Sequence, residues 1–587
     1  MAHSPPYCTE PSTGGQRKND TTIVVYNKPL PTAFGFGVGR GSPEEDKEFE
    51  ENPDERPPVK PLVELEMTQL SAELRRKPFW WTKCRDEAIL NKWREEALAQ
   101  AKLMKESHVD YVLEELVGYA NLRDDKSGAE VSCHNKIWQS DTLVPASLKK
   151  QLVTGAIKLE DVPESEKDWH PRSNGQVLDL VHPSLYPIVY GRTLSYPEDS
   201  DDRSLSALQL RLKPPQEKSA RLYWEPSGDY YISKRFQWLP TDFEVSEDGA
   251  SVRSLSYINN LNPIKHQSLC KAIDGLIAAF IPLFERVLTD SIPKNKAVPQ
   301  RTYNGYSYDR QAYRRSPDFL AYTDDQNFEE DHQEWANGRI FITPRIPEGG
   351  YSIGSLEKRP IKYKLAGRII QVIVKLANIH LTPENPEYSG GSWHVEGMKN
   401  EAIAASGIYY YDEENITESR LAFRTAVAPP YRYEQDDERG CMLTWGMRRE
   451  DPCVNELGSV ITRQDRCIAF PNTYQHRVSP FELVDKSKPG HRKIVALFLV
   501  DPAVRRPSTT TVPPQQAEWR ASGISGNQIL KSTLPPEIIN YVDSMVEGAM
   551  TRQEAEAYRL ELMDERKAFV ATNDEEFFMV PFALCEH

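Results

Sequence analysis

The sequence predicts an α+β protein in which a β-rich core of the sandwich or jelly-roll type lies between helical regions. Two observations lead to this fold class. From about residue 340, short runs rich in β-branched and aromatic residues alternate with Gly, Pro and Asn. On both sides of this region, apolar residues recur at helical spacing. The predicted strands cover residues 368–379, 393–396, 403–411, 421–426, 459–470, 474–478 and 492–500.

Residues 1–58 are expected to form a disordered or loosely attached tail. They combine Pro, Gly, Ser and Thr with a run of acidic residues, and such a composition offers little apolar surface to bury. Residues 59–339 follow as a mainly helical N-terminal region with a few strands.

The helical pattern is clearest in residues 85–107, where Ile89, Trp93 and Ala97 lie near one face of a predicted helix. Further helices are predicted over residues 109–122 and 264–288. The strands of this region are expected at residues 178–189 and 220–224.

The β-rich core is predicted over residues 340–510, and a C-terminal helical extension over residues 511–587. Helices are expected at residues 535–547 and 551–568. The second begins with the pattern of a capping box, in which Thr551 is followed three residues later by Glu554.

Composition restricts the function and the compartment. The chain has 72 basic and 87 acidic residues, a net charge of −15, which makes binding to nucleic acid or to an anionic membrane unlikely over its surface as a whole. No apolar run approaches the roughly 20 residues that a membrane span needs. Residues 1–15 lack the apolar stretch of a secretory signal, and the eight cysteines contain no CxxC pair. A cytoplasmic protein with reduced thiols is therefore expected.

The segment from Gly390 to Gly397, with the sequence GGSWHVEG, carries the strongest chemical signal. Residues two apart in an extended chain point the same way, so His394 and Glu396 share one face. An imidazole and a carboxylate side by side are two adjacent ligands for a divalent metal. His476, in a later predicted strand, is the candidate for the third.

Arg492 begins the apolar strand that follows His476 by 16 residues. Its neighbours on the same face, Ile494, Ala496 and Phe498, are apolar, so the guanidinium is expected to meet a buried anion. That anion could be the carboxylate of a cosubstrate, held by two hydrogen bonds.

Two histidines and one carboxylate on one side of a metal form the facial triad of non-haem iron(II) oxygenases. The order His-x-Glu, distant His, then Arg resembles the iron(II)/2-oxoglutarate oxygenase superfamily. The resemblance implies a double-stranded β-helix core (jelly roll, cupin-like), Fe(II) held by His394, Glu396 and His476, and 2-oxoglutarate held by Arg492. It also implies a second 2-oxoglutarate contact from an earlier strand, for which Gln371, Lys375 and Tyr257 are open alternatives.

A second resemblance extends from about residue 60 over most of the chain. Runs such as LVHPSLYP (residues 180–187) and QWLPTDF (residues 237–243) are similar to a large, mostly fungal family catalogued only as a domain of unknown function. It implies no activity.

The sequence therefore predicts a non-haem iron(II) oxygenase, dependent on 2-oxoglutarate, that oxidises a C–H bond of a small-molecule, amino-acid or peptide substrate. A metal oxidase or dioxygenase that does not use 2-oxoglutarate is one alternative. The other is a non-catalytic protein-interaction module. The helical regions offer surface for partners, including a second copy of the chain as a homodimer.

Overall fold

The structure is a computed structural model. It describes residues 24–26, 28–33, 56–198, 230–309, 325–430, 436–526 and 547–584, together with short pieces between them (202, 204, 207–208, 210–215, 317, 321, 433–434, 535–538 and 541). Two predicted elements, the strand at 220–224 and most of the helix at 535–547, lie outside the described residues.

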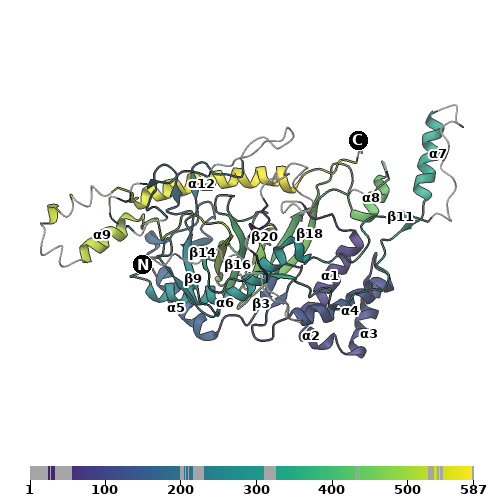
Figure 1. The fold of residues 1–587 in the computed structure, drawn as a ribbon, viewed down its shortest axis with the longest axis horizontal. Coiled ribbons are helices and arrows are strands. Elements are labelled where there is room, and N and C mark those ends of the chain that lie inside the picture. The colour runs from purple at the N-terminus through teal and green to yellow at the C-terminus, as the bar shows by residue number, and fades with distance from the viewer. Residues whose placement is uncertain are drawn as a thin grey trace, which may run out of the picture.

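The elements follow in chain order (Figure 1). The helices are α1 (Leu62–Arg76), α2 (Trp80–Lys83), α3 (Glu87–Gln100), α4 (Glu106–Leu122), α5 (Ala146–Glu160), α6 (Gln267–Ser291), α7 (Asp325–Gly338), α8 (Glu438–Trp445), α9 (Ala517–Gly526) and α12 (Arg552–Asn573). The longer strands and those used below are β2 (Glu130–Val131), β3 (Trp138–Ser140), β4 (Val177–Val181), β9 (Thr241–Val245), β10 (Val252–Ser254), β14 (Ile369–Leu381), β16 (Ile403–Glu414), β17 (Ser419–Ala426), β18 (Val454–Thr462), β19 (Cys467–Pro471), β20 (Gln475–Val478) and β22 (Gly490–Val500).

A nine-stranded antiparallel sheet forms the centre of the molecule. Its strand order is β10-β9-β14-β22-β16-β19-β3-β2, and β4 pairs with the free edge of β14. Five of these strands come from residues 130–254, so the sheet does not begin at the predicted boundary of residue 340. Those strands are two to five residues long, too short to stand out by their period in the sequence.

Helix α6 packs on one face of this sheet. Its apolar residues join those of β14, β16 and β22 in the largest core of the described residues. Gly407 of β16 permits the close approach, because a Cβ atom there would lie 2.8 Å from the ring of Phe280. The helix predicted at 264–288 is confirmed, and the structure continues it to Ser291.

A three-stranded antiparallel sheet, β18-β17-β20, covers the other face of the nine-stranded sheet. Its residues Leu421, Phe423 and Val460 share one core with Ile373 and Ala496 of the larger sheet. Two antiparallel sheets thus pack face to face around an apolar interior, with helices outside. The strand predicted at 459–470 is divided into β18 and β19 by a turn at residues 463–466.

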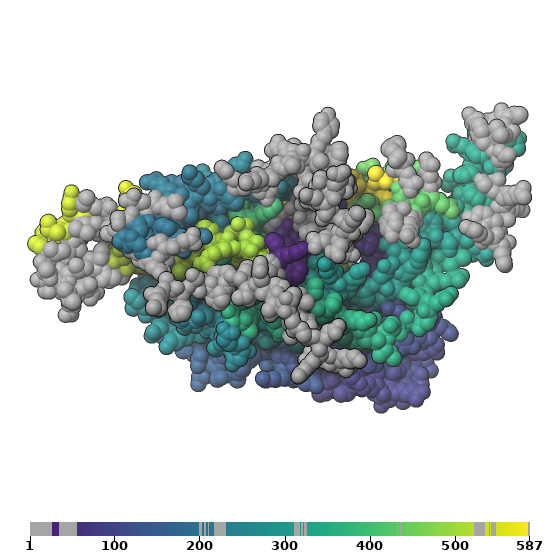
Figure 2. Space-filling model, in the orientation of Figure 1, coloured from purple at the N-terminus to yellow at the C-terminus, as the bar shows by residue number. Residues whose placement is uncertain are grey.

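Helix α12 runs along one side of both sheets, and α1 to α4 gather at one end (Figure 1). Helix α7 projects from that end in the space-filling view (Figure 2). The predicted threonine cap of α12 is confirmed, since the backbone N–H of Glu554 donates to Oγ1 of Thr551 at 3.2 Å. Among the described helices, none is both long and apolar enough to span a membrane.

Candidate metal centre

The segment that carries His394 and Glu396 lies beside β20 at the edge of the three-stranded sheet. His394 and His476 exchange two backbone hydrogen bonds, of 3.2 and 3.0 Å. Gly390 makes this approach possible: its φ is +86°, and a Cβ atom there would lie 2.7 Å from the carbonyl oxygen of Val478. The glycine that flanks the motif therefore brings the two predicted histidines together.

The three predicted ligands converge through their side chains. Nε2 of His476 lies 3.3 Å from Oε1 of Glu396, and Nε2 of His394 lies 3.8 Å from the same oxygen. One ligand atom from each residue falls within 4.8 Å of the other two. Side-chain exposure is 33% for His394, 14% for Glu396 and 4% for His476, so the cluster is open to solvent mainly on the side of His394.

Neighbouring groups fix the orientation of these ligands. Nδ1 of His394 lies 2.8 Å from the carbonyl oxygen of Ser392, so this nitrogen carries the proton and Nε2 keeps its lone pair. Asn472 holds the backbone of Glu396 by two hydrogen bonds, of 2.8 and 2.9 Å. Sequence reasoning did not select Asn472; its only signal is a polar residue beside a predicted ligand strand. The ring of Phe470 packs 4.8 Å from that of His476.

The charges of the cluster are strongly coupled. Burial would raise the pKa of Glu396, but the adjacent imidazoles of His394 and His476 outweigh burial and hold that pKa well below its usual range. Burial opposes protonation of His394, yet the Glu396 carboxylate raises the pKa of this histidine. For His476, burial and the nearby His394 lower the pKa despite the same carboxylate. The carboxylate is therefore ionised, and its negative charge attracts a cation.

Lys375 is the predicted cosubstrate residue that the structure couples to this cluster. It lies on the inner face of β14, opposite Ala496 of β22, and its charge opposes protonation of His394. No carboxylate within the described part of the chain lies at ion-pair distance from Lys375, although the charge of this lysine also acts on the buried carboxylate of Asp179. The small side chain of Ala496 leaves the lysine without a large neighbour across this strand pair.

Arg492 is buried as expected, but the anion that it meets belongs to the protein. Its Nη2 atom lies 3.2 Å from Oε2 of Glu413, and its Nη1 atom donates to Oγ of Ser419 at 2.7 Å. The ring of Phe481 lies 4.6 Å from the guanidinium carbon. The sequence could not show this pair, because Glu413 comes from β16 and reaches Arg492 only through the register of the sheet.

The structure places the other two predicted cosubstrate residues in internal contacts. The side-chain amide of Gln371 donates to Oδ1 of Asp242 and to the carbonyl oxygen of Arg506. The hydroxyl of Tyr257 donates to the carbonyl oxygen of Val512, and its ring packs against Trp519. Neither has a contact with the three predicted ligands in the described structure.

A second cluster, which sequence reasoning missed, combines His170, Asp179 and His182 beside β4. Nδ1 of His170 lies 2.7 Å from Oδ2 of Asp179. The same carboxylate forms an ion pair with the buried guanidinium of Arg559, from α12. Arg559 and His170 both contact Oδ2 of Asp179, while Oδ1 is buried without a hydrogen-bond partner among the described residues. The guanidinium already offsets the charge of the carboxylate, so this cluster fits an internal ion-pair network better than a cation site.

Comparison with known proteins identifies the family. Residues 106–523 match the family described as a protein of unknown function, DUF4246, and residues 31–96 match the N-terminal domain of unknown function of DUF4246. These matches cover most of the chain, which therefore belongs to this family. The predicted resemblance to a family of unknown function is confirmed. No curated protein matches the chain.

Several solved structures share limited similarity. The Fe(II)/α-ketoglutarate-dependent dioxygenase TqaL is 11% identical over 45% of this chain and 66% of its own, with a TM-score of 0.19. A BsmA homologue from Methylobium petroleophilum is 12% identical over 23% and 43%, with a TM-score of 0.14. Oxalate decarboxylase from Bacillus subtilis is 10% identical over 37% and 54%, with a TM-score of 0.12. The chain thus spans less than two thirds of the length of each of these proteins. Similarity at such low TM-scores carries no argument about the site described above.

Proposed function

We propose that the protein is a non-haem iron(II) oxygenase that uses 2-oxoglutarate to oxidise a C–H bond of a small molecule, amino acid or peptide. The observation that carries the proposal is the convergence of His394, Glu396 and His476. Two facing sheets with a shared interior fit a double-stranded β-helix, the jelly-roll fold expected for this activity.

The three residues suit iron(II) by their chemistry. Two imidazole nitrogens and one carboxylate oxygen are the donor set of the facial triad, which leaves positions open for cosubstrate and oxygen. The hydrogen bond from His394 to Ser392 frees Nε2 for a metal, and the ionised Glu396 offsets part of its charge. Iron bound there would supply the redox chemistry of dioxygen activation.

Lys375 is the residue that we assign to the cosubstrate. A dicarboxylate that reaches the triad with one end needs a cation for the other, and Lys375 faces the same interior without an ion-pair partner in the described chain. Its task is to orient the cosubstrate and to neutralise its distal charge. Arg492, already paired with Glu413, keeps a structural role in this proposal.

An oxidase that does not need 2-oxoglutarate would keep the triad and leave Lys375 without this task. A non-catalytic interaction module would need neither the metal-binding triad nor a cosubstrate contact from Lys375. These two alternatives differ from the proposal in what the purified protein binds, which makes them separable by titration.

The proposal is tested by anaerobic titration of the full chain with Fe(II), followed by 2-oxoglutarate. One Fe(II) per chain and a weak visible band on addition of 2-oxoglutarate are expected. Succinate release with pooled metabolites and peptides would then report turnover and narrow the substrate.

His394→Ala and His476→Ala should each lose the bound iron, because two protein ligands hold a labile divalent metal poorly against a chelator. His170→Ala is the matched control and should bind iron like the wild type. Iron retained by both triad variants would contradict the site, whereas iron without the band would favour the alternative that does not use 2-oxoglutarate.

A further inference from the structure

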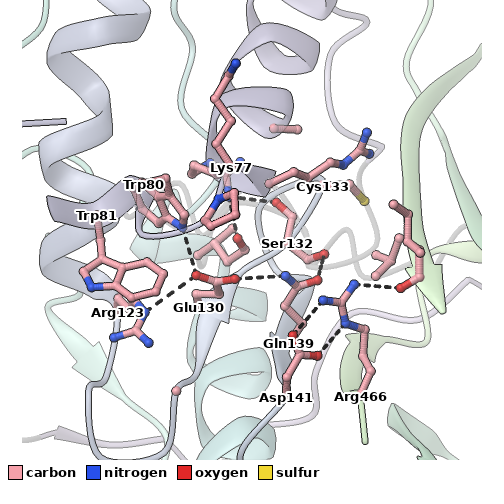
Figure 3. Close-up of a pocket in the computed structure, with 18 of the residues that line it drawn as sticks. Lys77, Trp80, Trp81, Arg123, Glu130, Ser132, Cys133, Gln139, Asp141 and Arg466 are labelled. Carbon is pink, nitrogen blue, oxygen red and sulfur yellow. Dashed lines mark hydrogen bonds and ion pairs between the residues drawn. The ribbon is translucent and has the colours of Figure 1, made fainter. Parts of the chain in front are cut away.

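A pocket of about 360 Å³ lies where the N-terminal helices meet the sheets, and no triad residue lines it (Figure 3). The end of α1 and helix α2 form one wall, the β2–β3 hairpin forms the floor, and β18 forms the other wall. Strand β18 is separated from the triad strand β20 by β17. The pocket falls within the usual size range for small-ligand sites.

The pocket lining is positive in a protein whose net charge is −15. Its acidic residues are Glu130 and Asp141, and its basic residues are Arg75, Arg76, Lys77, Arg123, Arg463 and Arg466. Both acids are occupied: Asp141 forms ion pairs with Arg463 and Arg466, and Oε2 of Glu130 lies 3.7 Å from Nε of Arg123. The remaining cations of the lining are Arg75, Arg76 and Lys77, and Nζ of Lys77 lies 3.8 Å from Oε2 of Glu96, outside the pocket. The excess positive charge therefore comes from Arg75 and Arg76.

Arg75 and Arg76 have no carboxylate partner within the described part of the chain. Arg75 is only 6% exposed, and its Nη1 atom donates to backbone carbonyls, including that of Ser132 at 2.8 Å. Arg76 is exposed and donates to the carbonyl oxygen of Ser459 at 2.8 Å. A buried guanidinium held only by neutral groups is costly, and an incoming anion would offset that cost.

Aromatic residues form the rim beside these cations. Phe79 is 63% exposed and has a φ of +57°, a left-handed conformation that bulky residues rarely adopt. Its ring lies 5.7 Å from that of Trp81, and the Arg123 guanidinium lies 3.8 Å from the Trp81 ring. An exposed ring in a strained backbone conformation points to a role outside folding.

Hydrogen bonds join the polar side chains of the pocket floor to one another (Figure 3). Glu130 accepts hydrogen bonds of 3.0 Å from Trp80 and from Gln139, and Gln139 in turn accepts one from Ser132 at 2.6 Å. The polar groups of the floor are thus hydrogen-bonded to one another, and a ligand can be bound by Arg75 and Arg76 without competition from them.

We propose that this pocket binds a small ligand that carries an oxyanion, a phosphate or a carboxylate, on a planar ring system. The oxyanion would meet Arg75 and Arg76, and the ring would stack on Phe79 and Trp81. The site is independent of iron and of the proposed oxygenase activity.

Binding is measured by calorimetry and tryptophan fluorescence on the iron-free full chain. The probes are adenosine monophosphate, 4-hydroxybenzoate and uncharged adenosine. At least one of the two anions should show saturable binding. Its affinity should be at least about tenfold higher than that of adenosine, because one charge-assisted hydrogen bond contributes about this factor. Binding of the nucleotide alone assigns a phosphate ester, and binding of the benzoate alone assigns a carboxylate.

Arg76→Gln and Phe79→Gly should each weaken that binding about tenfold. Both side chains are exposed, and glycine suits the left-handed conformation at residue 79, so these variants should keep the fold. Lys92→Gln, at an exposed cation of α3 outside the pocket, is the matched control and should bind like the wild type. No saturable binding of either anion, equal affinity for adenosine, or wild-type affinity in Arg76→Gln would overturn the proposal.

Discussion

Lys375 and Arg492 are two cations on the inner face of neighbouring antiparallel strands, and their partners give them different roles. Lys375 pairs in register with Ala496, four residues along β22 from Arg492. At about 3.3 Å per residue this separates the two positions by roughly 13 Å along the strand. Lys375 is coupled to His394, whereas Arg492 is matched to Glu413.

Lys375→Gln is therefore expected to weaken 2-oxoglutarate binding by about tenfold to a hundredfold, because it removes a charge-assisted contact to the distal carboxylate. The iron content should stay unchanged, because Lys375 is not a ligand. Anaerobic titration of the iron-loaded protein, followed by the visible band, measures both quantities.

Arg492→Gln serves as the comparison. It should lower the free energy of unfolding, because Glu413 loses its partner, and leave the affinity for 2-oxoglutarate close to that of the wild type. The opposite result, with Arg492→Gln selectively losing affinity and Lys375→Gln behaving like the wild type, would restore the role that the sequence predicts for Arg492.

The sequence predicts the ligand set better than its surroundings, for a physical reason. His394 and Glu396 are two residues apart, so the period of an extended chain alone puts them on one face. The ranking of Gln371, Lys375 and Tyr257 depends on strand register, which the local sequence does not contain. Asn472 likewise becomes visible only when two distant segments meet.

At the scale of elements, α12 is tied to the sheet by buried charge. Arg559 is 2% exposed and forms ion pairs with Asp168, at 2.7 Å, and with Asp179. Asp179 lies on β4, opposite Ala377 of β14. The same helix contributes Ala555 and Leu562 to the core between the two sheets. Its docking thus depends on both apolar burial and one ion-pair network.

Arg559→Ala should destabilise the protein by about 3–5 kcal/mol, because it leaves the carboxylate of Asp179 buried without its cation. Arg172→Ala is the matched control: Arg172 forms an ion pair with Asp564 of the same helix, but both side chains are more than half exposed. It should leave the free energy of unfolding nearly unchanged, because solvent screens an exposed ion pair. Urea unfolding of the two variants gives these values, and equal small losses would show that the buried pair contributes little.

The start of α12 was predictable, and its partners were not. Thr551 and Glu554 mark the N-cap locally, as the structure confirms. Asp168 and Asp179 lie nearly 400 residues earlier in the chain, and short polar pairs at that separation leave no pattern in a single sequence.

At the scale of the whole molecule, the mixed α and antiparallel β architecture was predictable because the long strands β14, β16 and β22 are strongly apolar. The number of strands in the central sheet was not predictable from the sequence. Strand β3 is held by pairing with β19 and by contact with α6, and β2 by pairing with β3 and by contact with α4. Such long-range contacts leave no pattern in the local sequence. The predicted division of the chain at residue 340 therefore cuts through one sheet.

The rate at which cysteine thiols react with a reagent tests whether the core is closed to solvent. The six described cysteines are free thiols, and five of them are buried. Burial raises the pKa of Cys133 to about 12, and that of the partly exposed Cys270 to about 11. Since the thiolate is the reactive form, we expect these six to react slowly with Ellman's reagent at pH 8 in the native protein.

All eight cysteines of the chain should react at once in denaturant, and peptide mapping by mass spectrometry assigns each site. Cys8 and Cys585 lie outside the described residues, so we make no prediction for their reactivity in the native protein, and they are mapped separately. Reactivity of Cys270 should rise as the pH approaches 11, because the thiolate fraction grows there, while Cys133 additionally needs the core to open. Rapid native labelling of Cys133 at pH 8 would contradict the burial on which both the two-sheet core and the wall of the basic pocket depend.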